Sequence, residues 1–204
     1  MISRIKSFVI TGGIACGKST VAAWLPQWGG DVLDADNVVH EMEAPGGAAV
    51  PLIAGAFGSG MLRSDGAVDR ARLGQMVFAD PGALERLNRL IHPLVRQRLE
   101  SWLAAPAPRG RRFRAAVIPL LFEVGWNLEP CDAVIAVVCD EAEQMRRLTD
   151  RGLALGEARR RIAAQMPCAD KARRADHVLW NNGSLEALHW AARKLFEDLL
   201  EKKS

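Results

Sequence analysis

The sequence lacks the long apolar segments that mark a membrane protein. No apolar run reaches the roughly 18–20 residues that a bilayer span requires. The apolar stretch near the beginning, 8–10, is short and is followed at once by glycines, which is not typical of a secretory signal peptide. We therefore expect a cytoplasmic protein that has no membrane partner.

Paired cysteines are also missing. The chain has four cysteines, and no two of them form a C-x-x-C pair. Without paired spacing a structural zinc site is not expected, and reduced thiols are the default in a cytoplasmic protein. The four are Cys16, Cys131, Cys139 and Cys168.

The chain has no strong bias of charge. The net charge is +3 at pH 7, whereas proteins that live on nucleic acid usually show a stronger or more clustered basic character. The most basic run consists of Arg109, Arg111, Arg112 and Arg114. We interpret this run as a solvated loop, with RNA or partner binding as the alternative. No nucleic-acid partner is expected, but a polyanionic small molecule would fit.

Short apolar strands alternate with helical segments along the 204 residues. The predicted strands are 5–11, 31–33, 115–118, 133–138 and 177–180. Helical spacing covers 18–28, 69–78 with Asp69 as N-cap, 82–103 with a kink at Pro93, 141–166 with a break near Gly152, and 184–201 with Ser184 as N-cap. This alternation predicts a three-layer α/β fold with a five-stranded parallel sheet, whose strand ends and ligands share one edge.

A phosphate-binding motif follows the first predicted strand and opens the first helix. Residues 12–19 read GGIACGKS and fit the pattern G-x-x-x-x-G-K-S/T. Its backbone N–H groups and the helix dipole would hold phosphates, Lys18 would reach the β and γ phosphates, and Ser19 would ligate Mg²⁺. The residues assigned to nucleotide binding here are Gly13, Ala15, Cys16, Gly17, Lys18, Ser19 and Thr20. The motif alone does not separate kinases from other nucleotide binders.

Two carboxylates, Asp34 and Asp36, follow the second predicted strand. Parallel strands end at one edge, so a carboxylate there can approach the γ-phosphate and an incoming hydroxyl. Phosphoryl transfer needs a group that orients and deprotonates the nucleophile, and Asp36 suits that role. The alternative is that both aspartates are N-caps of a helix beginning at Asn37. No N/T-K-x-D guanine signature is present.

The order of several further segments resembles the dephospho-CoA kinase family. Asp34–His40 resembles its D-A-D-x-x-x-R/H pattern, Ile91–Arg96 its H-P-x-V/I-R segment, and Pro119–Glu123 its P-L-L-F/V-E segment. The lid of that family resembles 161–167 with Lys171, and its A-D-x-V-I-x-N-x-G ending resembles 175–183. Together with 57–58, 65–66, 69–70 and 73–78, the resemblance spans about residues 8 to 185.

The resemblance implies transfer of the ATP γ-phosphate to the ribose 3′-hydroxyl of dephospho-CoA, with Mg²⁺, in a monomer or weak homo-oligomer. It implies a core of 1–36, 112–140 and 176–204, a helical substrate insertion of 37–111 and a lid of 141–175. Asp36 would be the base, Arg147 a transition-state cation, and Asn181 and Gly183 nucleotide contacts. The implied substrate contacts are Asp34, His40, His92, Arg96, Leu120, Glu123 and Arg151.

Several of these residues have a second interpretation. His40 would lie on the surface, His92 would only order the kink at Pro93, and Glu123 would form an ion pair instead of assisting Mg²⁺. The segment 149–152 and Trp180 depart from the family pattern, which leaves open which of Arg146, Arg147 and Arg151 reaches the phosphates. Other functions also stay open: a nucleoside monophosphate kinase, or a protein that binds nucleotide without transferring phosphate.

Overall fold

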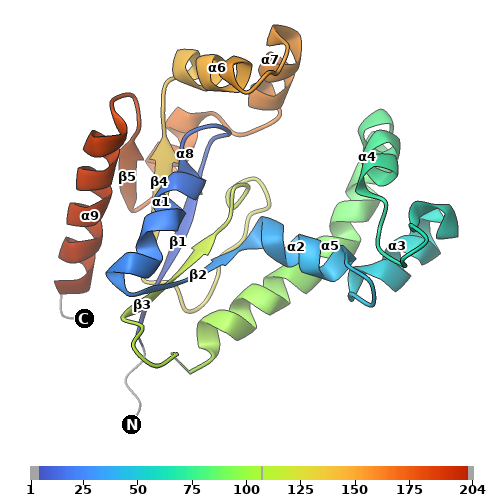
Figure 1. Cartoon of the computed structure of the whole chain (residues 1–204), viewed down its shortest axis with the longest axis horizontal. Helices are drawn as coiled ribbons and strands as arrows, with labels where there is room; N and C mark the ends of the chain where they lie inside the picture. The colour runs from blue at the N-terminus through green and yellow to red at the C-terminus, as the bar shows by residue number, and fades with distance from the viewer. Residues whose placement is uncertain (1–4, 107, 202–204) are drawn as a thin grey trace. The chain divides into compact units, whose positions relative to one another are not determined.

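A computed structural model describes residues 5–106 and 108–201 of the chain. The molecule divides into two compact units (Figure 1). The first comprises Met1–Leu33 with Leu103–Ser204, and the second is Asp34–Trp102. The predicted insertion, 37–111, covers most of the second unit, and its boundaries, like those of the lid, stay predictions.

The first unit is built on a five-stranded parallel sheet in the order β2-β3-β1-β4-β5. The strands are β1 Lys6–Gly12, β2 Gly30–Asp34, β3 Phe113–Val117, β4 Ala133–Val138 and β5 His177–Trp180. In register, Ile10 of β1 lies between Val117 of β3 and Ile135 of β4. The predicted fold class and all five predicted strands are confirmed.

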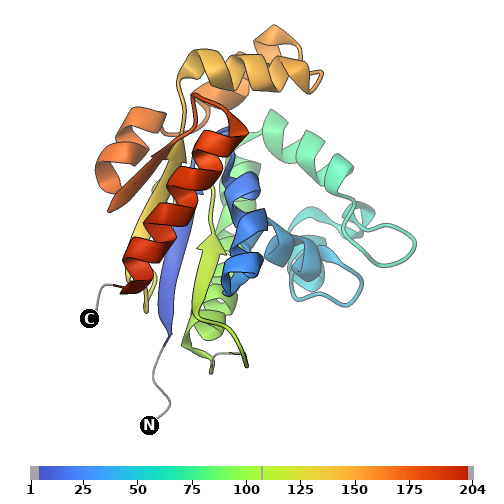
Figure 2. The same cartoon turned by 60° about the vertical axis from the view of Figure 1, so that its left-hand side comes forward.

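Two helices cover one face of the sheet. α1 (Lys18–Trp24) and α9 (Leu185–Glu201) contact each other and lie side by side in Figures 1 and 2. Beneath them Phe8, Phe113 and Phe196 form an aromatic cluster with ring centroids 5.2–5.8 Å apart. Such aromatic pairs bury large areas and add about 0.5–1.5 kcal/mol each beyond the burial itself. This core fixes the carboxyl end of β1, where the phosphate-binding motif begins.

The remaining helices of the first unit follow the sequence with local changes. The predicted helix 18–28 is α1 followed by a 3₁₀ turn, η1 (Leu25–Trp28), whose second residue is Pro26. α6 (Glu141–Asp150) and α7 (Leu155–Ala163) are separated where predicted, at Gly152, which has a φ of +87°. α8 (Cys168–Arg174) was not predicted, and it packs on β1 and β4. The Ser184 hydroxyl accepts from Ala187 N at 3.2 Å, so that cap is confirmed.

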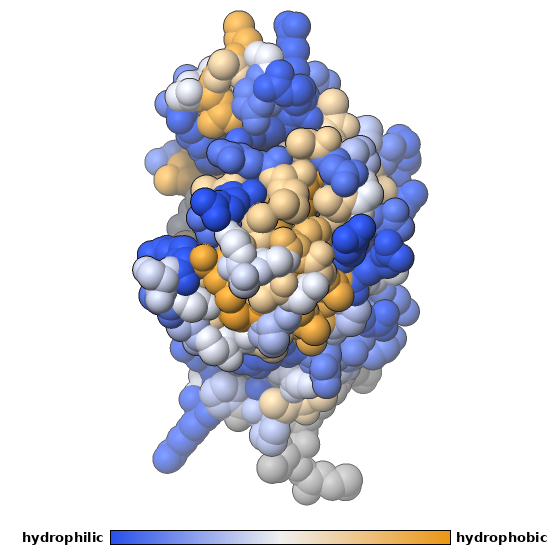
Figure 3. Space-filling view, turned by 90° about the vertical axis from the view of Figure 1, so that its right-hand side faces the viewer, coloured by the Kyte–Doolittle hydropathy of each residue, from blue (hydrophilic) through white to orange (hydrophobic). Residues whose placement is uncertain are grey.

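The second unit is helical, as predicted. It contains α2 (Ala35–Glu43), α3 (Ala49–Phe57), the 3₁₀ turn η2 (Ser59–Met61), α4 (Arg70–Ala79) and most of α5 (Pro81–Ala104). Asp69 caps α4 by accepting from Arg72 N at 3.1 Å. α5 continues through Pro93. Figure 3 shows apolar side chains bordered by hydrophilic ones on the side of α3 and α4, where Leu52 and Met76 are 39% and 38% exposed.

Two local predictions are wrong. α2 begins at Ala35 and not at Asn37, because the Asp34 side chain accepts from Asp36 N and ends the strand in a cap. Arg114 is not part of a solvated loop: it lies in β3 and is only 2% exposed. Its guanidinium donates to Asp31 at 3.3 Å and to the carbonyl of Leu103 at 3.1 Å, which offsets the cost of burying the charge.

The other arginines of that run, Arg109, Arg111 and Arg112, are exposed as predicted. Within residues 5–106 and 108–201, none of the helices combines the length and the apolar character that crossing a membrane would need.

Candidate active site

The phosphate-binding motif forms a loop between β1 and α1, whose backbone conformation requires small residues. Ala15 and Gly17 have φ values of +59° and +99°, in the left-handed region. A Cβ on Gly17 would lie 2.5 Å from Asn181 Nδ2, and a Cβ on Gly13 would lie 2.5 Å from Cys168 Sγ. The glycines therefore let the side chain just after β5 and the first side chain of α8 approach the loop closely.

Side chains distant in the sequence hold the loop in place. Gln165 Oε1 accepts from Ile14 N, and Gln144 Nε2 donates to Ile14 O, each at 2.8 Å. Asn181 Nδ2 donates to Cys16 O at 2.9 Å. Gln165 lies in the segment 161–167 that resembles the family lid, but no sequence motif marks either glutamine as a support for the backbone of another residue.

The donors of the loop are arranged as an anion cradle. Within the described part of the chain, the N–H groups of Ala15 and Gly17 donate to no acceptor. Lys18 Nζ donates to the carbonyls of Gly12 at 3.0 Å and Gly13 at 2.7 Å, which keeps its charge on the loop itself. Ser19 is exposed in the first turn of α1. These N–H groups, the cation and the exposed hydroxyl suit a bound polyphosphate.

Arg147 of α6 holds the loop from one side. Its guanidinium donates to Ala15 O at 3.1 Å, to Asn181 O at 2.7 Å and to Glu143 at 2.8 Å. Arg146 instead donates to Glu143 and Asp150 of its own helix. The hydrogen bond from Arg146, and then the charge of Arg147, lower the pKa of the Glu143 carboxyl to about 2. Glu143 therefore stays ionised and aligns both arginines.

The other arginine considered in the lid, Arg151, is exposed and is the C-cap residue of α6. Thr20, on the first turn of α1, is half-buried. Gly183, just after β5, is exposed. The structure thus brings Arg147 and Asn181 against the loop through direct bonds.

Glu123 takes part in an ion pair with a buried lysine. Lys171 of α8 is fully buried, and its Nζ lies 2.7 Å from both Glu123 Oε1 and Pro119 O. Glu123 Oε1 also accepts from Met166 N at 3.0 Å. The pair joins α8 to the turn after β3, next to the exposed Leu120. Glu123 thus forms the ion pair that was the alternative interpretation, and a contact between Glu123 and the substrate stays a prediction.

The remaining candidates lie in the second unit. Asp34 Oδ1 accepts from Asp36 N at 2.9 Å, so Asp34 is the N-cap of α2 and Asp36 lies exposed in the first turn. His40 is also exposed on α2. On α5, Arg96 bonds to Glu100 at 2.7 Å, and burial of the half-buried His92 lowers its pKa.

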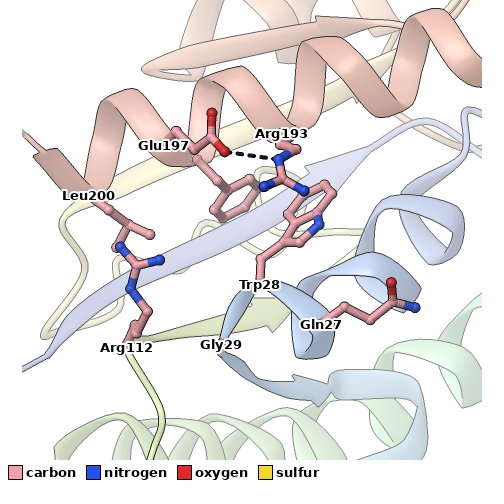
Figure 4. A pocket seen from close by; sticks show the side chains of 8 residues that line it. Gln27, Trp28, Gly29, Arg112, Arg193, Glu197 and Leu200 are labelled. Atoms are coloured by element: carbon pink, nitrogen blue, oxygen red, sulfur yellow. Dashed lines mark hydrogen bonds and ion pairs between the residues drawn. The ribbon is translucent and has the colours of Figure 1, made fainter.

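A pocket of about 310 Å³ lies at the other end of the sheet (Figure 4). Arg112 and Gly29, which line it, precede β3 and β2, whereas the phosphate-binding loop follows the carboxyl end of β1. Ligands of open α/β sheets bind at the carboxyl ends of the strands. Arg193 in this pocket pairs with Glu197 at 2.9 Å. The pocket is therefore separate from the nucleotide cradle.

No group of three or more His, Cys, Asp or Glu side chains within the described residues is arranged to hold a metal ion. Mg²⁺ is usually held by one or two protein oxygens together with substrate phosphates, so a protein cage is not required for it. The exposed Ser19 hydroxyl beside the cradle is an oxygen of the kind that Mg²⁺ prefers.

Comparison with known proteins gives one consistent answer. A family model described as dephospho-CoA kinase matches residues 7–187. The dephospho-CoA kinase of Anaeromyxobacter dehalogenans is 46% identical over 93% of this chain and 90% of its own length. That of Symbiobacterium thermophilum is 41% identical over 87% of this chain and 74% of its own length.

Solved structures agree on the fold. The TT1252 protein of Thermus thermophilus has a TM-score of 0.77 at 36% identity and covers 97% of this chain and 99% of its own. The dephospho-CoA kinase of Campylobacter jejuni has a TM-score of 0.66 at 22% identity, covering 97% and 98%. An Acinetobacter baumannii shikimate kinase has a TM-score of 0.56 at 17% identity, covering 98% and 95%. The last two likenesses bear on the fold alone.

Proposed function

The chain belongs to the dephospho-CoA kinase family, and from this premise we propose how its residues carry out the reaction. It is an ATP-dependent kinase that phosphorylates dephospho-CoA in the biosynthesis of coenzyme A. The finer proposal is that the γ-phosphate goes to the 3′-hydroxyl of the substrate ribose. The observation that supports phosphoryl transfer is the Lys18 loop, whose backbone donors and cation suit a polyphosphate, and the choice of the 3′-hydroxyl rests on the family resemblance.

Lys18 is the group we assign to the transferred phosphate. Its ammonium donates to two loop carbonyls, and phosphate oxygens are stronger acceptors because they carry charge. If phosphate oxygens replaced these two carbonyls as acceptors, the Lys18 ammonium would lie beside the P–O bond that breaks. Stabilising charge that develops in the transition state is the main catalytic task in phosphoryl transfer.

The loop and its supports bind and orient the nucleotide. Gly13, Ala15, Cys16 and Gly17 would offer backbone contacts, and Thr20, Asn181 and Gly183 would complete the nucleotide site. Ser19 Oγ would be the protein ligand of Mg²⁺, which, when bound with ATP, neutralises charge on the β and γ phosphates. Arg147 acts from behind the loop, because its guanidinium is already bonded to Ala15 O and Asn181 O.

Asp36 is the proposed base. It follows β2 by two residues, in the segment that resembles the D-A-D pattern of the family. The capping role belongs to Asp34, so capping does not account for a carboxylate at Asp36. Phosphoryl transfer needs the attacking hydroxyl to be oriented, and a carboxylate at this position can accept its hydrogen bond.

Contacts to the acceptor are the remaining assignments. We assign His40, His92 and Arg96 to dephospho-CoA, with Asp34, Leu120, Glu123 and Arg151 as further contacts. Histidine and arginine side chains suit the phosphates and ribose of such a substrate. A cytoplasmic location, a monomer or weak homo-oligomer and the lack of a nucleic-acid partner stay predictions.

The decisive experiment measures ADP release by the purified protein with Mg²⁺-ATP and a panel of acceptors. Stimulation by dephospho-CoA alone, with coenzyme A as the product, is the expected result. Stimulation by a nucleoside monophosphate would move the acceptor and contradict the proposal. ATP binding without release by any acceptor would favour a non-catalytic nucleotide binder.

A further inference from the structure

Three of the four cysteines meet at the phosphate-binding loop. Cys16 Sγ lies 3.2 Å from Cys139 Sγ and 3.5 Å from Cys168 Sγ. They come from three elements: the loop, the residue after β4 and the first residue of α8. Cys131 is separate, and its thiol contacts Ala133 O at 3.4 Å. The sequence spacing of 123 and 152 residues gave no sign of this trio.

The loop is packed tightly around these sulfur atoms. A Cβ on Gly13 would lie 2.5 Å from Cys168 Sγ and 3.0 Å from Cys16 Sγ. Cys16 and Cys139 are 0% and 1% exposed, whereas Cys168 is half-buried. Cys168 is therefore the member that a small solute in the surrounding water can reach.

The three thiols differ in how readily they lose a proton. Contact with Cys16, together with the charge of Arg147, lowers the pKa of Cys139 below its ordinary value. The contact with Cys139 raises the pKa of Cys16 to about 11. The contact with Cys16 and burial raise the pKa of Cys168. Cys139 is thus the thiol of the trio that ionises most readily, whereas Cys16 and Cys168 keep their protons to higher pH.

We propose that a hydroperoxide oxidises this trio, joining Cys16 to Cys168 in a disulfide that inactivates the phosphate-binding loop. In the first step the Cys168 sulfur attacks the peroxide, the O–O bond breaks, and a sulfenic acid and an alcohol (or water) are formed. In the second step the Cys16 sulfur attacks the sulfenic sulfur of Cys168 and displaces hydroxide, and the hydroxide takes up the Cys16 proton and leaves as water. Two electrons pass from the two thiols to one peroxide.

The bond would change the loop because its atoms must move. A disulfide is about 2.05 Å long, so the two sulfur atoms must approach each other from 3.5 Å. Cys16 O is held by Asn181 at 2.9 Å, and α8 is held by the buried Lys171. Formation of the disulfide therefore opposes both of these interactions and links α8 covalently to the loop. Its effect on turnover rests on the proposed function.

The test begins with reduced wild-type protein treated with hydrogen peroxide. Peptides are mapped by mass spectrometry without reduction, and dephospho-CoA-dependent ADP release is followed before and after dithiothreitol. We expect a Cys16–Cys168 linked peptide and a loss of activity of at least tenfold, reversed by the reductant. Cys168→Ser should keep its activity under peroxide, whereas Cys131→Ser, the matched control, should lose it like the wild type.

The second step has its own readout. In Cys16→Ser this step cannot take place, so that dimedone traps a sulfenic acid at Cys168 that the wild type does not accumulate. The proposal is overturned if oxidised wild-type protein contains no Cys16–Cys168 peptide, or if Cys168→Ser is inactivated as fast as the wild type. The peptide map does not depend on any activity, so failure of the proposed reaction would be seen separately, in the reduced enzyme.

Discussion

The two compact units hold their functional residues in different ways. In the first, the backbone of 14–16 is held by Gln144, Arg147, Gln165 and Asn181, which come from elements more than a hundred residues away. In the second, Asp34 and Arg96 bond to neighbours two and four residues along the chain. The phosphate-binding loop is thus fixed by the tertiary fold, whereas these two bonds of proposed acceptor residues are each local to one helix.

This difference has a consequence for catalysis. Preorganised donors stabilise transition-state charge because they need not reorganise during the reaction. Substitutions in the supports of the loop should therefore affect turnover even though the altered side chains never touch the substrate. Substitutions in the second unit should affect acceptor use while leaving ATP binding nearly unchanged.

The largest effect is expected for Lys18→Ala. Loss of the cation should lower kcat by at least about 10³-fold, because one electrostatic partner of the transition state is removed. Far-ultraviolet circular dichroism should show an intact fold. Lys194→Ala, which removes a lysine stacked 5.2 Å from the Trp190 ring, is the control and should be nearly silent. Near-normal turnover of the Lys18 variant would falsify the cradle assignment.

Asp36→Asn should have the second-largest effect. It should lower kcat by about 10²-fold or more while ATP affinity changes little, because a base acts in the transition state. Asp34→Asn is the matched variant, because asparagine caps helices as well as aspartate does. Steady-state kinetics and ATP titration of both proteins decide the matter. If Asp34→Asn proves the more damaging change, the wrong aspartate has been chosen.

Lys171→Met tests the ion pair that joins α8 to the turn after β3. Removal of the lysine leaves Glu123 without its partner, and we expect a loss of about 2–3 kcal/mol of unfolding free energy. This loss is somewhat below the value for a fully buried pair, because the Glu123 side chain is 20% exposed. Urea unfolding measures it. Adding Glu123→Gln to Lys171→Met should recover part of the loss. No recovery would mean that the two residues act independently.

Arg147→Met should lower kcat by about tenfold, the effect of losing buried hydrogen bonds worth roughly 1–2 kcal/mol. Arg146→Met is the matched control, since the bonds of Arg146 stay within α6. Kinetics at saturating ATP compare the two. Equal effects on turnover would show that Arg147 does not act through the loop.

The smallest effect concerns His92. Burial lowers its pKa in the folded protein below the ordinary value of 6.5. The unfolded chain therefore takes up the proton first, and stability contributed by neutral His92 is lost as the pH falls through and below that value. Between about pH 7 and pH 5, His92→Gln should lose less unfolding free energy than the wild type. Parallel curves from urea unfolding would contradict this.

The sequence predicted the strands and the cradle because their signals are local. Apolar runs mark β1 and β4, and the spacing of glycines and Lys18 marks the loop. The first residues of helices were predicted less exactly. Asp34 and Asp36 are both suitable N-cap residues, so the sequence does not say which of them caps α2. Periodicity therefore establishes an element more reliably than its first residue.

Long-range partners could not be predicted in the same way. Nothing in the run of arginines distinguishes the buried Arg114 from the exposed Arg112, since the difference is the nearby Asp31 and a carbonyl in the last turn of α5. The same holds for Lys171, whose partner Glu123 lies 48 residues earlier in the numbering. Such contacts are set by the sheet order, which brings distant segments together.

The most direct test of the account uses an acceptor that lacks the reactive group. ADP release and product mass should be measured with dephospho-CoA and with its 3′-deoxy analogue, at equal concentrations and saturating Mg²⁺-ATP. We predict turnover with dephospho-CoA, and with the analogue neither a phosphorylated product nor ADP release above the level without acceptor. A phosphorylated analogue would place the transfer at another atom and contradict the proposed 3′-hydroxyl acceptor.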